Sequence, residues 1–198
     1  QIFVEYSSQK CKTCLRWFKT YIVMKISILL PYKENFSPRY AGAVSLLVND
    51  STLKSRYRKN ITVYGSTEFK EKFHPRYKNI SFNKYFFESS NIKYTDYFLK
   101  HEEKYKSDLI EIHNRPAVFN YIMKIDPEKK IILYFHNDPL SIRGSITKAQ
   151  RINILKNAAS IIFVSEWTKK RFFQGINYFK NNSPVHVVYP SVNRKKFN

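Results

Sequence analysis

The sequence predicts an α/β domain built on a doubly wound parallel sheet, and two observations carry this prediction. The first is an uninterrupted apolar run, 131–135, which gives way abruptly to the polar residues His136, Asn137 and Asp138. A short apolar run that ends in a turn is typical of a strand buried on both faces. The second is a regular alternation of such runs with helical patterns, which predicts right-handed βαβ units.

The predicted strands are short apolar runs, each closed by a turn residue or a polar cluster. They lie at 25–30, 61–64, 80–87, 108–112, 130–135, 159–164 and 185–189. Open parallel sheets place their chemistry just past the carboxyl ends of the strands. His136, Asn137 and Asp138 therefore stand where such a fold puts an active site.

Five helices are predicted between the strands. The first opens at 41–43 and places Val44, Leu47, Val48 and Leu53 at helical spacing. The second covers 92–106. The third covers 117–125, with Val118, Tyr121, Ile122 and Ile125 on one face, and the fourth covers 147–157, with Ile152 and Leu155 turned inward. The fifth runs to about residue 173, with Ser165 as its N-cap.

The chain has 198 residues, enough for one domain with a sizeable core, and its formal net charge is +20. Nucleic acid, an anionic membrane surface or a phosphorylated substrate would each explain such a charge. The joint richness in Lys, Asn, Ile, Phe and Tyr offers another account, because AT-rich codons give the same composition. In that case much of the lysine is a solvated surface.

Residues 1–23 are predicted to be an N-terminal extension, 24–190 the domain, and 191–198 the start of a linker. Both cysteines, Cys11 and Cys14, fall in the extension and have no second pair, which argues against a zinc site or a disulfide framework. The longest apolar region, 21–30, contains Lys25 and is shorter than the ~20 residues that a membrane span requires. We expect a cytoplasmic protein, with peripheral membrane contact as an alternative.

Four features, taken in order, resemble a known family. They are 25–31 followed by Ala41, Gly42 and Ala43; the segment 108–116; the segment 133–138; and 158–171 followed by 185–193. Together they resemble the N-terminal half of a GT-B glycosyltransferase of family 4 (glycosyl transferase group 1 type). The resemblance implies a Rossmann-like domain on the acceptor side of a two-domain enzyme. The donor-binding C-terminal domain has no counterpart in this sequence, so the chain alone is expected to be inactive.

The resemblance also implies a function. The enzyme would be a retaining, nucleotide-sugar-dependent hexosyltransferase. It would act on a saccharide or lipid-linked acceptor in the synthesis of cell-envelope polysaccharide or lipopolysaccharide. Its partners would be the nucleotide-sugar donor, the acceptor and an anionic membrane surface at its periphery. No nucleic acid, metal ion or cofactor is expected.

Individual residues take roles from the same resemblance. The implied catalytic residues are His136 and Asp138; the implied donor phosphate-binding residue is Gly42; the implied acceptor-binding residues are His113, Asn114, Arg115, Asn137 and Arg143. An imidazole can bond a sugar hydroxyl or support charge near the reacting carbon. A glycine at a helix N-terminus lets free N–H groups approach a phosphate. An arginine can pair with an acceptor phosphate or carboxylate.

Structural roles remain open for the same residues. His136 can satisfy a turn, and Asp138 can either orient His136 or cap the turn before Pro139. Gly42 can simply start a helix, and Arg115 can tie its own loop together.

The sequence bears on two other functions. An NAD-type oxidoreductase would need a GxGxxG turn after the first strand, and 31–42 contains none. A basic, non-catalytic binding domain for nucleic acid or an anionic membrane surface is the main alternative. Nucleic-acid binding would need its basic residues gathered on one face. Here they are scattered along the chain.

Overall fold

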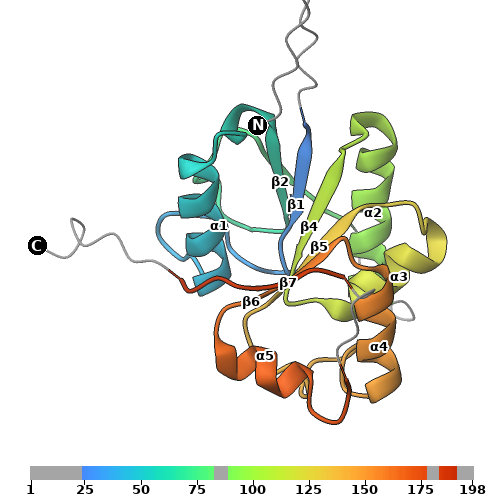
Figure 1. Ribbon diagram of the computed structural model, residues 1–198. Coiled ribbons are helices and arrows are strands. Elements are labelled where there is room, and N and C mark those ends of the chain that lie inside the picture. Colours follow the sequence, from blue (N-terminus) through green and yellow to red (C-terminus); the bar gives the residue numbers. More distant parts are fainter. Residues whose placement is uncertain (1–23, 83–88, 178–182, 191–198) are drawn as a thin grey trace, which may run out of the picture.

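The computed structural model describes residues 24–82, 89–177 and 183–190, which form one parallel sheet with helices on both faces (Figure 1). The strand order is β3-β2-β1-β4-β5-β6-β7, and all neighbouring pairs are parallel. The strands are β1 (Ile26–Leu29), β2 (Ile61–Gly65), β3 (Tyr77–Asn79), β4 (Leu109–His113), β5 (Ile131–Phe135), β6 (Ser160–Phe163) and β7 (Val185–Val187). The order reverses between β1 and β4, as in Rossmann-like folds, so the predicted fold class is confirmed.

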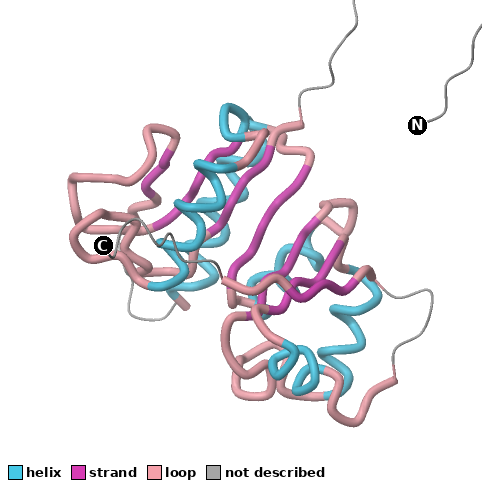
Figure 2. Tube along the Cα trace, turned by 60° about the vertical axis from the view of Figure 1, so that its left-hand side comes forward, coloured by secondary structure: helices cyan, strands magenta, loops and turns pink. Residues whose placement is uncertain are grey.

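The helices divide between the two faces of the sheet. They are α1 (Ala43–Lys54), the short 3₁₀ helix η1 (Arg58–Asn60), α2 (Ser90–Tyr105), α3 (Pro116–Ile125), α4 (Lys148–Asn157) and α5 (Glu166–Phe172). In Figure 1, α1 lies on one side of the strands and α2, α3 and α4 lie on the other. Figure 2 shows the same arrangement of helices around the strands from a second direction.

Two hydrophobic clusters form the core, one on each face. The larger holds Ile112 and Leu133 of the central strands and Phe98, Phe119 and Leu155 of the helices α2, α3 and α4. The smaller lies beneath α1 and is built around Ile28, Val48 and Val63. Successive side chains of a strand point to opposite faces. Residues that alternate with Ile112 and Leu133 therefore project from the sheet face that carries α1.

The third strand differs from the prediction, which placed it at 80–87. The structure has β3 at Tyr77–Asn79, paired with Val63 to Gly65 of β2, and residues 80–82 are not strand. Residues 83–87 lie outside the described part of the chain. An edge strand of three residues, with two of them exposed, has none of the apolar alternation that predicts strands. Ile80 is buried, but it belongs to the core after the strand has ended.

The inward faces of three helices also differ in part from the predictions. Helix α1 buries Ser45, Asn49 and Thr52 with Val48, and it leaves Leu53 51% exposed. Helix α3 buries Val118 and Ile122 as predicted, but Ile125 is exposed.

In α4, Ile152 is exposed and Arg151 is buried beside Leu155. Arg151 can be buried because backbone carbonyls accept its hydrogen bonds. The predicted cap of α5 is confirmed, since the Ser165 hydroxyl accepts from the Thr168 N–H.

The predicted extension (1–23) and linker (191–198) lie outside the described residues. Within the ranges that the structure describes, no helix is both long and apolar enough to cross a bilayer.

Candidate functional site

The site lies where β4 and β5 end side by side. His113 is the last residue of β4 and aligns with Tyr134 of β5, so the turns that follow the two strands are neighbours. These turns stand next to the point where the strand order reverses, between β1 and β4. Ligands of open α/β sheets bind outside the carboxyl ends of the strands at such a point.

Two histidine rings meet on the α1 side of the sheet. His113 Nδ1 lies 3.1 Å from His136 Nε2, and the ring of His113 also stacks on the ring of Tyr134. On its other edge, His113 Nε2 lies 3.6 Å from a carboxylate oxygen of Glu111. Burial, and next the neighbouring His113, lowers the pKa of His136 to about 3. His136 is therefore a neutral imidazole at physiological pH.

Asn114 joins the two turns. It has a left-handed backbone conformation, with φ of 55°, which asparagine adopts more readily than most residues. Its side-chain oxygen accepts from the backbone N–H groups of His136 and Asn137, at 3.4 Å each, and its own N–H donates to the Tyr134 carbonyl. Asn114 thus fixes the turn that carries His136.

A cavity of about 660 Å³ opens on the other side of Asn114, between α2, α3 and the loop after β5. We call it the Asn114 cavity. Four of the five predicted acceptor-binding residues line it, namely Asn114, Arg115, Asn137 and Arg143. The fifth, His113, does not line it: its side chain is 3% exposed and faces Glu111 and His136. The structure therefore separates a histidine pair on one face of the sheet from a cavity on the other.

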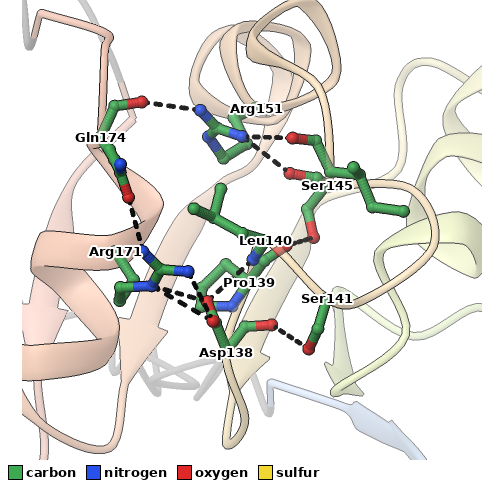
Figure 3. Close-up of polar contacts among 9 residues, drawn as sticks. Asp138, Pro139, Leu140, Ser141, Ser145, Arg151, Arg171 and Gln174 are labelled. Carbon is green, nitrogen blue, oxygen red and sulfur yellow. Dashed lines mark hydrogen bonds and ion pairs between the residues drawn. The ribbon is translucent and has the colours of Figure 1, made fainter.

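The loop between β5 and α4, which forms one wall of the cavity, is held from two sides (Figure 3). The guanidinium of Arg151 donates to the carbonyls of Ser145, Ile146 and Gln174. The Ser145 hydroxyl donates to the Pro139 carbonyl at 2.6 Å. These bonds fix the path of the loop between its two ends, because Ser145 and Pro139 belong to it.

Gly144 fixes the same loop against α3. Its φ is +100°, and a Cβ at this position would collide with the backbone of Pro116 and Ala117. The Asn120 side-chain amide donates to the Gly144 carbonyl at 2.9 Å. Only glycine allows this approach without strain. The position of Arg143, the preceding residue, follows from it.

Asp138 points toward Arg171 of α5 (Figure 3). Its carboxylate accepts from Arg171 Nη2 at 2.8 Å and from Arg171 Nε at 3.2 Å, and it also accepts from the Leu140 N–H at 3.0 Å. The hydrogen bonds from Arg171, ahead of those from the backbone, lower the pKa of Asp138. Two structural roles were open for Asp138, and the hydrogen bond from the Leu140 N–H fits the cap of the turn. The carboxylate bonds the loop and α5 and does not orient His136.

Gly42 is the N-cap of α1, but a carboxylate from the same chain occupies the helix end. Glu34 Oε1 accepts from the Ser45 N–H at 3.2 Å, and a Cβ on Gly42 would collide with that carboxylate. A carboxylate is stabilised at a helix N-terminus, as a phosphate is. A donor phosphate at Gly42 would therefore have to displace Glu34.

Sequence reasoning missed four residues of this region: Glu34, Glu111, Arg151 and Arg171. Glu111 could have been found, because it stands two residues before His113 on the same strand and so on the same face. The contacts of the other three cross irregular loops, where no periodic pattern indicates which residues meet. Arg171 lies 33 residues from Asp138, and no local pattern predicts that contact.

No cluster of three or more potential metal ligands (His, Cys, Asp or Glu) occurs among the described residues.

Comparisons with known proteins agree with this fold. No protein-family model matches the chain. A putative glycosyltransferase of Bacillus subtilis (strain 168), YtcC, is 31% identical over 90 residues, which cover 46% of this chain and 21% of that protein.

Three solved structures resemble the chain over most of its length. A sucrose-phosphate synthase (tll1590) from Thermosynechococcus elongatus has a TM-score of 0.59 at 12% identity, over 86% of this chain and 49% of that one. Anabaena Alr3699/HepE, solved in complex with UDP and glucose, has a TM-score of 0.56 at 16% identity, over 87% and 46%. A glycosyltransferase from Rickettsia africae ESF-5 has 0.54 at 13%, over 88% and 45%.

These likenesses define a class of fold. The chain has the Rossmann-like fold that occurs within these GT-B glycosyltransferase-like proteins, and it spans about half the length of the three solved structures. It spans about a fifth of the length of the curated relative.

Proposed function

We propose that this chain is the acceptor-side domain of a retaining, nucleotide-sugar-dependent glycosyltransferase of the GT-B type, family 4. The acceptor would be a saccharide or a lipid-linked saccharide, and the pathway cell-envelope polysaccharide or lipopolysaccharide synthesis. The observation that carries the proposal is the Asn114 cavity. It lies at the carboxyl edge of the sheet, and Asn114, Arg115, Asn137 and Arg143 line it. Its volume, about 660 Å³, is within the usual range of small-molecule sites.

The lining of the cavity suits a sugar. Asn91, Thr95, Asn120 and Tyr121 add amides and hydroxyls to the residues named above. An asparagine amide both donates and accepts hydrogen bonds, so it matches a sugar hydroxyl in either sense. Ile92, Val118 and Ile142 add apolar surface for the C–H faces of the ring.

His136 would stand beside the transferred sugar at the mouth of the neighbouring turn. As a neutral ring it can donate or accept one hydrogen bond to a sugar hydroxyl without adding charge. In a retaining transfer, the bond from the anomeric carbon to the phosphate breaks and a bond to the acceptor oxygen forms on the same face. The departing phosphate takes the acceptor's proton. Asp138 would contribute through the loop that it holds, since Arg171 and Leu140 engage its carboxylate.

The donor would be a nucleotide sugar. The complex of Alr3699/HepE with UDP and glucose supports this choice by analogy of fold. Its diphosphate would approach the N-terminus of α1 at Gly42 once Glu34 moves aside. By itself, the 198-residue chain is expected to bind an acceptor without transferring sugar.

The test is saccharide binding to the 198-residue chain, followed residue by residue with ¹⁵N NMR. A panel of neutral and anionic mono- and disaccharides should shift the backbone amides of Asn114, Arg115, Asn137 and Arg143. Amides at the opposite edge of the sheet, such as that of Lys130, should not move.

The proposal fails if no saccharide binds, or if the shifts fall away from the cavity. Anionic lipid vesicles and duplex DNA serve as comparison ligands for the alternative of a basic binding domain. Binding to either of these without saccharide binding would favour that alternative.

A further inference from the structure

We propose that the Asn114 cavity selects a saccharide bearing an anionic group, a carboxylate or a phosphate, and that Arg115 and Arg143 bind that group. The inference rests on the proposed function, because it names the acceptor class of the same site. Both arginines line the cavity, and none of the described residues that line it is acidic. The cavity therefore offers positive charge to a ligand and no negative charge of its own.

Arg115 forms no ion pair among the described residues, although the charge of Glu34 acts on it from a distance. It follows β4 and forms the N-cap of α3, where it is half-buried. The one hydrogen bond that its guanidinium makes among the described residues runs from Nη1 to the Asn114 carbonyl, at 2.9 Å. Burial, more than any other influence, lowers the pKa of its guanidinium. The remaining N–H groups are free for a ligand, and a carboxylate or phosphate can take two of them at once.

Arg143 approaches the cavity from the loop between β5 and α4. Its side chain is exposed, but the loop that carries it is fixed by the contact of Gly144 with Ala117 and by the bond from Asn120. The arginine is therefore presented from a rigid backbone and loses only side-chain freedom when it binds. Two arginines from different elements, β4–α3 and β5–α4, then face one ligand.

An acidic group does lie close to the cavity, but it is already engaged. The carboxylate of Asp96 accepts a hydrogen bond from the hydroxyl of Tyr121, which lines the cavity, at 2.8 Å. Asp96 itself is not part of the lining. Asp96 is thus engaged by Tyr121. Glu34, the carboxylate that acts on the charge of Arg115, accepts from the Ser45 N–H at the N-terminus of α1 and does not line the cavity either.

The saccharide component is needed as well as the charge. A site for a bare anion would be a small group of hydrogen-bond donors. This cavity is larger, at about 660 Å³, and amides, hydroxyls and apolar side chains line it. A membrane headgroup is a different class of partner, and it enters only as an outcome of the test.

The experiment uses matched pairs of probes with the 198-residue chain, at fixed ionic strength. Methyl glucoside is compared with methyl glucuronoside, and glucose with glucose 6-phosphate. Dissociation constants are measured by NMR titration. We expect each anionic probe to bind about tenfold tighter than its neutral partner, the gain that a charge-assisted bidentate contact typically gives. Inorganic phosphate and acetate alone should bind more weakly than the anionic sugars.

Three charge-neutralising variants complete the test. Arg115→Gln and Arg143→Gln should each reduce the preference for the anionic probe to about threefold or less, since each removes one cation from the contact. Lys124→Gln is the control, because it makes the same charge change on the exposed side of α3 and does not line the cavity. It should leave the preference unchanged. Arg143 is exposed, so we expect Arg143→Gln to fold. This variant therefore tests the anionic preference even if Arg115→Gln destabilises the fold.

The outcomes separate the two proposals. Equal binding of neutral and anionic sugars would overturn the anionic preference and leave the acceptor function in place. If Lys124→Gln also lost the preference, general charge attraction would explain the preference. The proposed role of Arg115 and Arg143 would then be wrong. Phosphate binding as tightly as glucose 6-phosphate, or vesicle binding alone, would refute the saccharide part. Binding of no sugar at all would contradict the proposed function itself.

Discussion

His113 Nδ1 and His136 Nε2 lie 3.1 Å apart, so one proton must be shared between two stacked imidazoles. Glu111 lies 3.6 Å from the far nitrogen of His113, too far for a hydrogen bond, but its negative charge favours the tautomer with a proton on that nitrogen. With that nitrogen protonated, His113 Nδ1 accepts and His136 Nε2 donates. His136 then keeps Nδ1 as an unprotonated acceptor. Glu111 thus acts on His136 through His113, as a positioning residue.

The first prediction concerns stability against pH. The pKa of His136 falls from its ordinary 6.5 to about 3 in the folded chain. As the pH drops below 6.5, His136 takes up a proton in the unfolded state but stays neutral in the folded state. The free energy of unfolding therefore falls between pH 6.5 and about 3. Above pH 6.5 this contribution to stability is complete. The loss from this one group is at most about 1.4 kcal/mol per pH unit.

Urea unfolding at several pH values measures this effect in the native chain and in His136→Asn. His74 and His101 also have lowered pKa values, chiefly through burial, so only the difference between the two proteins isolates His136. We expect a shallower loss of stability below pH 6.5 in the variant. Parallel pH curves would show that His136 is not a buried neutral ring.

The second prediction concerns the tautomer of His136. In Glu111→Gln the carboxylate no longer favours a proton on His113 Nε2, so both tautomers of the pair should be populated. The ¹⁵N chemical shifts of the ring nitrogens report this directly. Glu111 is partly exposed, and we expect the free energy of unfolding to change by less than about 1 kcal/mol. Glu103→Gln, on the exposed side of α2, is the control. Unchanged ring shifts in Glu111→Gln would rule out the positioning role.

The third prediction concerns Asp138 and Arg171. Hydrogen bonds from Arg171 lower the pKa of Asp138, so the pair stabilises the fold above the ordinary carboxyl pKa and this stability is lost as the pH falls through the lowered value. In Arg171→Met the pKa of Asp138 should rise toward 3.8, as measured by ¹³C NMR of the carboxyl carbon. The amides of Ser141 and Arg143 should also exchange faster with solvent, because the loop loses its bond to α5.

Lys169→Met provides the comparison for Arg171→Met, since Lys169 is a basic residue of the same helix that pairs with Glu166. It should leave the pKa of Asp138 at its native value. An unshifted Asp138 in Arg171→Met would mean that the loop turn, through the Leu140 N–H, sets this pKa alone.

Much of the frame of the site follows from local sequence pattern. The apolar run of β5 and its abrupt end placed His136 and Asn137 at the edge of the sheet, and the same logic placed Asn114 and Arg115 beside them. Strand alternation also requires His113 and Ile112 to face opposite sides. The alternation therefore predicts that His113 and the cavity lie on opposite faces, although the family resemblance implies an acceptor-binding role for His113.

What the sequence could not predict depends on contacts between distant segments. Arg151 is buried because carbonyls of the preceding loop and of Gln174 surround it, and its helix carries no apolar stripe that would mark that face. Helix α1 likewise turns Ser45 and Thr52 inward in place of Leu53. The engagement of α1 by Glu34 depends on the path of the loop 31–42, which has no periodic pattern.

The fourth prediction compares two glycines that flank the site. Gly144 has φ of +100°, and a Cβ there would meet the backbone of α3, which cannot yield without moving the helix. Gly144→Ala should therefore cost about 2–4 kcal/mol of unfolding free energy, from strain and collision together. Gly42 has φ of −75°, which any residue adopts, and its added Cβ would meet only the end of the Glu34 side chain. That carboxylate can swing away.

Gly42→Ala should thus cost less than about 1 kcal/mol, the usual worth of a carboxylate at a helix N-terminus. Chemical denaturation of the two variants measures both costs, and the double variant Glu34→Ala/Gly42→Ala checks the cause. Once Glu34 is shortened, the alanine at position 42 should add almost no further loss. Equal losses in Gly144→Ala and Gly42→Ala would show that Glu34 is as rigid as the backbone of α3. In that case the N-terminus of α1 would be closed to any donor phosphate.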